Sequence, residues 1–143
     1  MQNTQPIIVG VDGSEASLEA LREARTMAEA LGSPLTAVAA WELPPTAAQY
    51  PYPVEQDFED SARKRLEHAL QTVFGDDRPE GLQTVVRGGT PARVLRDLSE
   101  GARMVVVGSR GHGGFAGLLL GSVSSAVAAH AKCPVLVTRR RSS

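Results

Sequence analysis

The sequence predicts an α/β fold: one doubly wound domain in which helices cover both faces of a five-stranded parallel sheet. Two observations predict it. Apolar runs of strand length alternate with helical patterns from end to end, without low-complexity segments or a convincing internal repeat. The chain has 143 residues, the size of one ordinary domain, so we expect residues 1–143 to form a single unit.

The first third of the chain predicts a strand, a helix and a second strand. Residues 6–11 form an apolar run suited to a strand that is buried on both faces. A helix follows the turn at 12–14, and Gly32 stands where a helix commonly ends. Residues 35–41 predict the second strand. The inward residues of the helix recur at helical spacing and are Leu18, Leu21, Ala24, Ala28 and Leu31.

The middle of the chain predicts an irregular segment, a helix and a short strand. Prolines between 43 and 53 exclude a regular helix, so we expect a surface excursion there. The second helix starts with acidic residues, and Gly75 ends it. Residues 82–86 predict the third strand. One face of the helix is apolar and comprises Phe58, Ala62, Leu66, Ala69, Leu70 and Val73.

The last third completes the alternation. Thr90 and Pro91 supply an N-cap and a first helical position for the third helix. Residues 103–108, 122–131 and 134–138 predict the fourth strand, the fourth helix and the fifth strand. Strands that alternate with helices in this way form parallel sheets with right-handed crossovers.

Composition indicates a soluble, folded protein. Hydrophobic residues make up 42% and charged residues 22% of the chain, close to the globular average. No apolar run is long enough to span a bilayer, and the amino terminus lacks a basic start followed by an apolar stretch. The single cysteine, Cys133, fits a reducing compartment. We therefore expect a cytoplasmic protein without a membrane partner.

Charge is unevenly distributed, although the formal net charge is only −1. Glu100 is the last acidic residue, and six basic residues follow it. A nucleic-acid partner is not favoured, because residues 139–141 have the character of a solvated tail. The absence of carboxylates near the glycine-rich segment that starts at 108 means little local repulsion of a bound phosphate.

That glycine-rich segment is the most informative motif. Gly108, Gly111, Gly121 and Ser122 follow the apolar run 104–107 in the order Gly, two residues, Gly, nine residues, Gly-Ser. Glycines let backbone N–H groups approach an anion, and a helix N-terminus supplies free donors and a positive dipole. The segment therefore predicts a phosphate cradle between a strand and a helix. Glycines that merely form a long turn are the alternative.

Two strand ends carry chemically distinctive residues, at 10–14 and at 108–111. Ligands of doubly wound sheets bind where the strand order reverses, outside the carboxyl ends of the strands. We therefore expect the first and fourth strands to flank that point, with Asp12 beside the cradle. Asp12 is a candidate ribose or metal contact. An equally weighted alternative is a helix-capping or turn residue.

The glycine spacing, the motif at 9–14 (Val-Gly-Val-Asp-Gly-Ser) and the ending at 133–137 (Cys-Pro-Val-Leu-Val) together resemble the ATP-binding branch of the universal stress proteins. The resemblance covers essentially the whole chain. It implies the strand order 3-2-1-4-5, a homodimer, and ATP binding without established efficient catalysis. It also implies Mg²⁺ with the ATP and a homodimer contact along Val135, Leu136 and Val137.

The resemblance also implies a nucleotide site. Asp12 would meet the ribose, Gly108 would border it, and the backbone of Ala40 would bind adenine. Backbone N–H groups of Gly111, Gly121, Ser122 and Val123 would surround the phosphates, with the Ser122 hydroxyl as a further donor. The complete implied site is Gly10, Val11, Asp12, Ala40, Gly108, Ser109, Arg110, Gly111, His112, Gly113, Gly114, Gly121, Ser122, Val123 and Ser124.

Rival motifs fit less well. A dinucleotide pattern at Gly111, Gly113 and Ala116 does not open a helix directly and lacks the later acidic residue. A Walker loop needs a lysine after glycine, which neither Lys64 nor Lys132 provides. No residue is assigned a catalytic role, because no histidine or acid is placed to activate the serines of the segment.

The function expected from these observations is that of an ATP-binding regulator, in which ATP occupancy biases contacts between chains or with partners in a stress response. Two alternatives stay open. One is a slow ATP hydrolase or phosphotransferase that uses Asp12 and a divalent ion. The other is a protein whose main ligand is cyclic AMP.

Overall fold

A computed structural model of the chain describes residues 5–109 and 121–139 and shows a five-stranded sheet in the order β3-β2-β1-β4-β5. All four neighbouring strand pairs are parallel. The predicted fold class and strand order are thereby confirmed. The strands are β1 (Ile7–Gly10), β2 (Leu35–Trp41), β3 (Gln83–Gly88), β4 (Met104–Gly108) and β5 (Val135–Thr138).

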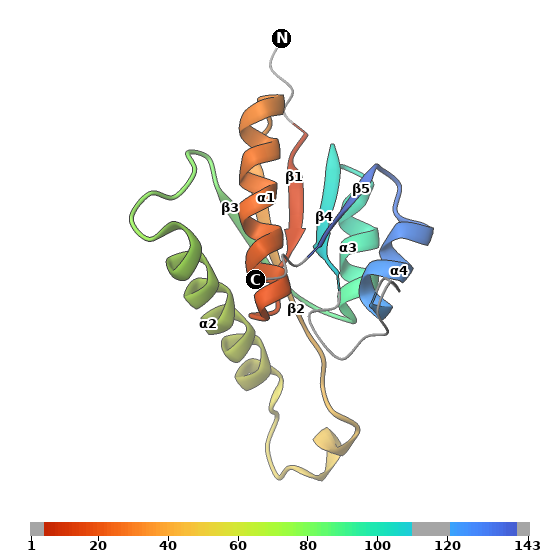
Figure 1. Cartoon of the computed structure of the whole chain (residues 1–143). Helices are drawn as coiled ribbons and strands as arrows, with labels where there is room; N and C mark the ends of the chain where they lie inside the picture. The colour runs from red at the N-terminus through yellow and green to blue at the C-terminus, as the bar shows by residue number, and fades with distance from the viewer. Residues whose placement is uncertain (1–4, 110–120, 140–143) are drawn as a thin grey trace.

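Helices cover both faces of the sheet, as Figure 1 shows. One face carries α1 (Glu15–Leu31) and α2 (Glu55–Phe74), and the other carries α3 (Pro91–Ser99) and α4 (Ser122–His130). A short 3₁₀ helix, η1 (Pro45–Gln49), lies between β2 and α2. None of the helices in the described ranges has the length and hydropathy needed to cross a bilayer.

The sheet separates two hydrophobic cores. Side chains alternate along β1, so that Ile7 and Val9 pack under α1 and α2 while Ile8 packs under α3 and α4. On β4, Val106 likewise packs under α1 and α2, whereas its neighbour Val105 packs under α3 and α4. Burial on both faces explains why these strands appear in the sequence as continuous apolar runs.

Specific residues cap the helix ends, and of these Gly32, Gly75 and Thr90 were predicted from the sequence. Ser14 caps α1 by accepting a hydrogen bond from the N–H of Ser17, and Gly32 ends it with φ of 65°. Thr90 caps α3 by accepting from the N–H of Arg93. Gly75 follows α2 with φ of 57°, a left-handed backbone that favours glycine. The predicted start and end signals of these helices are confirmed.

Several boundaries differ from the sequence predictions. β3 runs from 83 to 88 rather than from 82 to 86, because its pairing with β2 continues to Trp41 and Gly88. The segment 43–53 is not wholly irregular, since the N–H groups of Ala47 and Tyr50 close two tight turns. β1, β4, β5 and α4 are shorter than predicted by one or two terminal residues, although the N–H of Val11 still donates to the Val38 carbonyl and the N–H of Arg103 to the Pro6 carbonyl.

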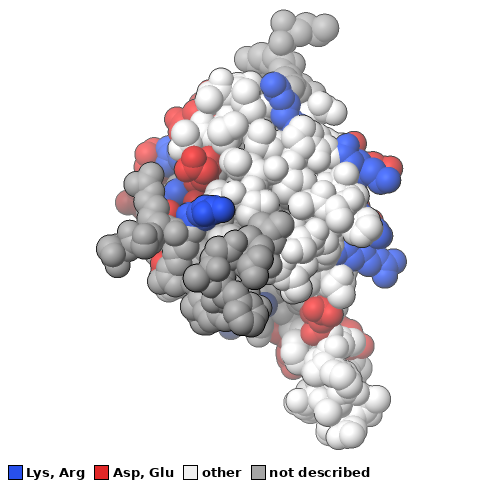
Figure 2. Space-filling view, turned by 45° about the vertical axis from the view of Figure 1, so that its right-hand side comes forward, with Lys and Arg blue, Asp and Glu red and all other residues white. Residues whose placement is uncertain are grey.

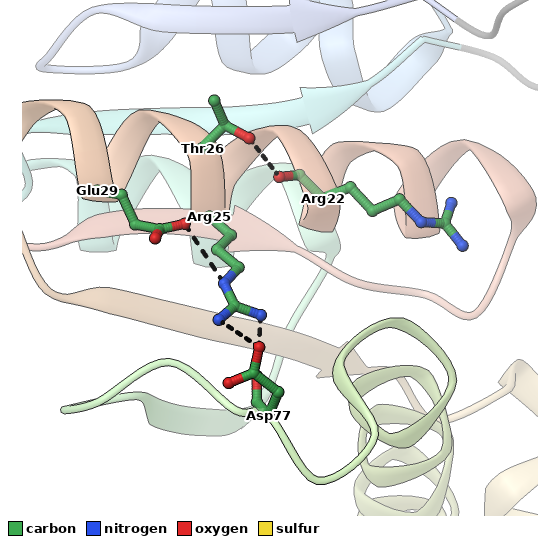
Figure 3. A network of polar contacts seen from close by, with 5 residues as sticks. All are labelled: Arg22, Arg25, Thr26, Glu29 and Asp77. Carbon is green, nitrogen blue, oxygen red and sulfur yellow. Dashed lines mark hydrogen bonds and ion pairs between the residues drawn. The ribbon is translucent and has the colours of Figure 1, made fainter.

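One polar network links α1 to the connection between α2 and β3. The Arg25 guanidinium donates to the carboxylate and to the backbone carbonyl of Asp77, at 3.1 and 2.8 Å. It also pairs with Glu29 and lies 5.1 Å from the centroid of the Phe74 ring. Figure 3 shows this arginine reaching from α1 toward Asp77. The network therefore joins the two helices that cover one face of the sheet.

Candidate functional site

A cavity of about 370 Å³ lies at the carboxyl ends of β1 and β4, where the strand order reverses. This size lies in the usual range for small-molecule sites, roughly 300–1,000 Å³. The first residues of α1, α3 and α4 border the same cavity. In a parallel sheet these helices all start at the carboxyl edge, so their positive dipole ends converge there.

Every predicted site residue that the structure describes lines this one cavity. These residues are Gly10, Val11, Asp12, Ala40, Gly108, Ser109, Gly121, Ser122, Val123 and Ser124. The first and fourth strands flank the cavity as expected, and Asp12 lies beside residues of the predicted cradle. The remaining predicted positions, Arg110, Gly111, His112, Gly113 and Gly114, lie outside the described residues.

Asp12 belongs to a compact turn formed with the start of α1. Its carboxylate accepts a hydrogen bond of 2.9 Å from the Ser14 N–H, and its own N–H donates to the Ser17 hydroxyl at 3.3 Å. The Ser17 hydroxyl donates in turn to the Ser14 carbonyl at 3.0 Å. The turn role predicted as one alternative for Asp12 is confirmed, and it fixes the position of the carboxyl group.

The same turn controls the charge of Asp12. Partial burial of the carboxyl raises its pKa, but hydrogen bonds from Ser14 and Ser17 together outweigh that effect and hold the pKa of Asp12 below its ordinary value. Asp12 is therefore ionised at neutral pH. An ionised carboxylate is an acceptor for hydroxyl groups or a ligand for a cation, not an acid.

The start of α4 differs from the starts of α1 and α3. Its N-cap is Gly121, which has no side chain, and no side chain of residues 5–109 and 121–139 caps the helix. The first intrahelical bond runs from the Ser125 N–H to the Gly121 carbonyl at 2.9 Å. The N–H groups of Ser122, Val123 and Ser124 precede that bond, so helix geometry gives them no intrahelical acceptor. Three backbone donors thus stand at the cavity.

The serine side chains at this helix start differ from each other. Ser124 is 2% exposed, and its hydroxyl donates to the Gly121 carbonyl at 3.2 Å. Only its backbone N–H is therefore left for a ligand. Ser122 is exposed, which agrees with the prediction that its hydroxyl is available as a donor.

Gly108 has a structural role in addition to its place beside the cavity. A Cβ at this position would lie 2.5 Å from the Ala16 carbonyl oxygen and 2.7 Å from the Ala16 carbonyl carbon. Only glycine lets the end of β4 approach the first turn of α1 so closely. At Gly10 the nearest atom to an added Cβ is Leu95 Cδ1, at 2.9 Å, on a flexible side chain.

Sequence reasoning missed the apolar wall of the cavity. Val38, Pro91 and Leu95 line it together with Ala40, from β2 and α3. Pro91 was assigned to helix initiation, and neither motif nor spacing connects it or Leu95 to the cavity. Ser14 and Ser17 were missed as lining residues for the same reason, although the turn at 12–14 was predicted.

The described residues around the cavity do not form a metal centre. No group of three or more histidine, cysteine, aspartate and glutamate residues gathers anywhere in residues 5–109 and 121–139. Cys133 is only partly buried, packs against the core under α3 and α4, and has a pKa raised by burial.

A doubly wound α/β protein with a ligand-sized cavity at the reversal of its strand order is the class that this fold and cavity define. The chain belongs to the universal stress protein family, because the sequence model of that family matches residues 3–139. The resemblance on which the sequence analysis depended is thus confirmed at the level of the family.

Curated relatives support the assignment to this family. A universal stress protein of Mycolicibacterium smegmatis is 37% identical over 143 residues, which cover 95% of this chain and 46% of that protein. The chain spans less than half the length of the curated relatives that it matches.

Solved structures share the fold. Universal stress protein UspA from Lactobacillus plantarum is 24% identical, with a TM-score of 0.67 over 97% of this chain and 100% of its own. A universal stress protein in complex with cAMP is 29% identical, with a TM-score of 0.62 over 95% of this chain and 97% of its own.

Proposed function

We propose that the cavity binds an adenine nucleotide, ATP in the first place, and that its occupancy regulates contacts between chains or with partners in a stress response. The observation that carries the proposal is the uncapped start of α4 in the same cavity as the ionised Asp12. Backbone donors suit phosphate oxygens, and a carboxylate suits the hydroxyls of ribose.

The apolar wall of the cavity suits the adenine base of the nucleotide. Val38, Ala40, Pro91 and Leu95 offer a surface for a flat base, while the backbone of Ala40 at the edge of β2 supplies polar contacts to adenine. Mg²⁺ with the ATP would neutralise part of the phosphate charge. Among the described lining residues, Asp12 is the only carboxylate that could contact such an ion or its water shell.

Calorimetric titration of the nucleotide-free chain with ATP and Mg²⁺ tests the proposal, and Ser122 allows a sharp version. Ser122 is the first residue of α4, where proline is tolerated, and Gly121 has the extended backbone that a following proline requires. Ser122→Pro removes one N–H and the hydroxyl, whereas Ser122→Ala removes the hydroxyl alone. We expect Ser122→Pro to weaken ATP binding about tenfold more than Ser122→Ala.

Adenosine provides the control for this pair. Both variants should bind adenosine like the unchanged chain, because adenosine has no phosphate to meet the start of α4. Equal ATP affinity in the proline variant, the alanine variant and the unchanged chain would remove α4 from the site. Absence of ATP binding to the folded, unchanged chain would overturn the proposal as a whole.

Cyclic AMP is the second candidate ligand, favoured by the related structure that holds it. Competition distinguishes the two. If cyclic AMP displaces bound ATP at much lower concentration than ATP displaces cyclic AMP, cyclic AMP is the main ligand. The start of α4 suits the phosphate of either compound, so the Ser122 variants should weaken the binding of both ATP and cyclic AMP. Only the ratio of the two affinities identifies the main ligand.

We also propose a homodimer formed along β5. The Pro134 and Thr138 carbonyls accept hydrogen bonds from the N–H groups of Val105 and Ser109, so the alternation of a strand directs the N–H groups of Val135 and Val137 to the open edge. Val137→Pro removes one edge donor without touching the β4 ladder, and Val137→Ala keeps it. Light scattering should show a weakened dimer only for the proline variant, and a strict monomer in the unchanged chain would contradict the proposal.

A further inference from the structure

The exposed large hydrophobic side chains of the described residues all lie in one short segment. They are Leu43, Tyr50 and Tyr52, with 39%, 46% and 55% of their surface exposed. We call residues 42–54, which connect β2 to α2, the arm. Elsewhere in the described chain no large apolar side chain is so exposed, so the arm carries apolar surface that the domain itself does not need for folding.

The arm projects from the body of the domain and is stiffened. Figure 1 shows it extending beyond the carboxyl edge of the sheet, and η1 within it buries no residue. Four prolines restrict its backbone, and Val54, which is 4% exposed, anchors its end. The Tyr50 and Tyr52 rings lie 6.3 Å apart and present a joint surface. Such stiffness lowers the entropy lost on binding.

The charges around the arm are acidic. No charged residue occurs from 43 to 54, whereas Glu42 precedes this stretch and Glu55 and Asp57 follow it. Figure 2 shows the arm as an uncharged lobe at the lower right with acidic side chains where it joins the body. None of these three carboxylates takes part in an ion pair with another described residue. A surface of acidic phospholipid or nucleic acid would therefore repel the base of the arm.

The same edge of the domain also carries unpaired basic residues. Arg87, near the end of β3, lies in register with Ala40, two residues before the arm begins. Arg93 lies in the first turn of α3. Both are exposed, and neither pairs with an acidic group in the described part of the chain. Unpaired acidic and basic groups at one edge make that edge self-complementary under two-fold symmetry.

We propose that the arm docks on a second copy of this chain in a two-fold pairing. Tyr50 and Tyr52 of each copy pack against the exposed apolar side chains of the other copy's arm, because these are the exposed large apolar side chains that the described chain offers. The acidic base of each arm, Glu42 and Glu55, faces Arg87 and Arg93 of the other copy. This contact is separate from the edge of β5, which lies at the side of the sheet, and it does not depend on nucleotide binding.

Charge reversal tests the pairing, with sedimentation velocity as the readout and Val137→Pro as the background that weakens the β5 contact. Glu42→Arg with Glu55→Arg should weaken association about tenfold or more, as should Arg87→Glu with Arg93→Glu. An equimolar mixture of these two proteins should associate like the background protein. A single chain with all four substitutions should do the same, because each copy again meets opposite charges.

The tyrosines test the apolar part. Tyr50→Ser with Tyr52→Ser should weaken association about tenfold or more, whereas Tyr50→Phe with Tyr52→Phe keeps the rings and should change it little. In the chain without Val137→Pro, the serine pair should convert assemblies larger than dimers into dimers. A background protein that stays monomeric at high concentration, a serine pair without effect, or a mixture that fails to associate would each overturn the proposal.

Discussion

Substituting alanine for Gly108 tests how the site is assembled. The added Cβ would meet the backbone of Ala16 at 2.5 Å, about 0.9 Å inside the 3.4 Å at which ordinary contact begins. Backbone atoms in the first turn of a helix cannot rotate away as a side chain can. The end of β4 and the start of α1 must therefore separate, or one of them must distort.

Overpacking of a well-packed core costs about 1–3 kcal/mol, and a clash with backbone belongs at the upper end. We expect Gly108→Ala to lower the free energy of unfolding by about 3 kcal/mol and the urea midpoint by about 1–2 M. If the end of β4 and the start of α1 move apart, the turn of Asp12, Ser14 and Ser17 is also displaced, because α1 begins there. A loss of nucleotide affinity should therefore accompany the loss of stability.

Urea titration followed by the fluorescence of Trp41, the single tryptophan, measures the effect. Two glycines serve as matched controls. Gly101→Ala places a Cβ in open space and should stay within about 0.5 kcal/mol of the unchanged chain. Gly10→Ala meets only the flexible Leu95 side chain and should be intermediate. If Gly108→Ala is as stable as Gly101→Ala, the close approach of β4 to α1 is wrong.

Three further predictions concern α1 and the turn before it. Asp12 has a lowered pKa in the folded state, so its ionised carboxylate stabilises the fold fully above the unfolded pKa, and this stabilisation is lost as pH falls through the folded pKa. When the pH is lowered from neutral to 3, the urea midpoint should therefore fall less for Asp12→Asn than for the unchanged chain. Ser14→Ala removes the cap of α1 and should cost about 1 kcal/mol by urea titration, whereas Ser14→Asn should restore most of it. Arg25→Gln should cost about 1 kcal/mol because it breaks the contacts with Asp77 and Phe74, whereas Arg22→Gln, which breaks only an exposed pair with Glu19, should cost less than half as much.

The elements of this fold were predictable because local signals agree with the tertiary structure. Apolar runs mark strands that are buried on both faces, and Gly32, Gly75 and Thr90 mark helix ends that the structure confirms. The end of β3 was not predictable in the same way. Arg87 and Gly88 have little strand propensity, and only pairing with Ala40 and Trp41 of β2 extends the strand to include them.

The strand order required more than local pattern. Residues at 10–14 and at 108–111 indicated that β1 and β4 are neighbours, because chemically distinctive strand ends gather at the reversal of a doubly wound sheet. The positions of the two edge strands came from the family resemblance. Pairing between distant segments leaves no periodicity in the sequence from which the rest of the order could be derived.

The two walls of the cavity differ in how visible they were. Asp12, Gly121 and Ser122 occupy loops and a helix start, where special backbone chemistry marks the sequence. Val38 and Leu95 occupy ordinary strand and helix positions, where an apolar side chain indicates only burial. An apolar surface for a base therefore looks the same in a sequence as an apolar core.

Gly108 shows that even a visible motif residue can be assigned for an incomplete reason. The family resemblance implied that Gly108 borders the ribose, yet the packing of Ala16 against it requires glycine whether or not a ligand binds. That packing brings the start of α1 to the end of β4, and β4 leads toward the start of α4. The same contact thus places the Asp12 turn and the uncapped donors of α4 around one cavity. A glycine required for packing is in this way also a precondition for the site.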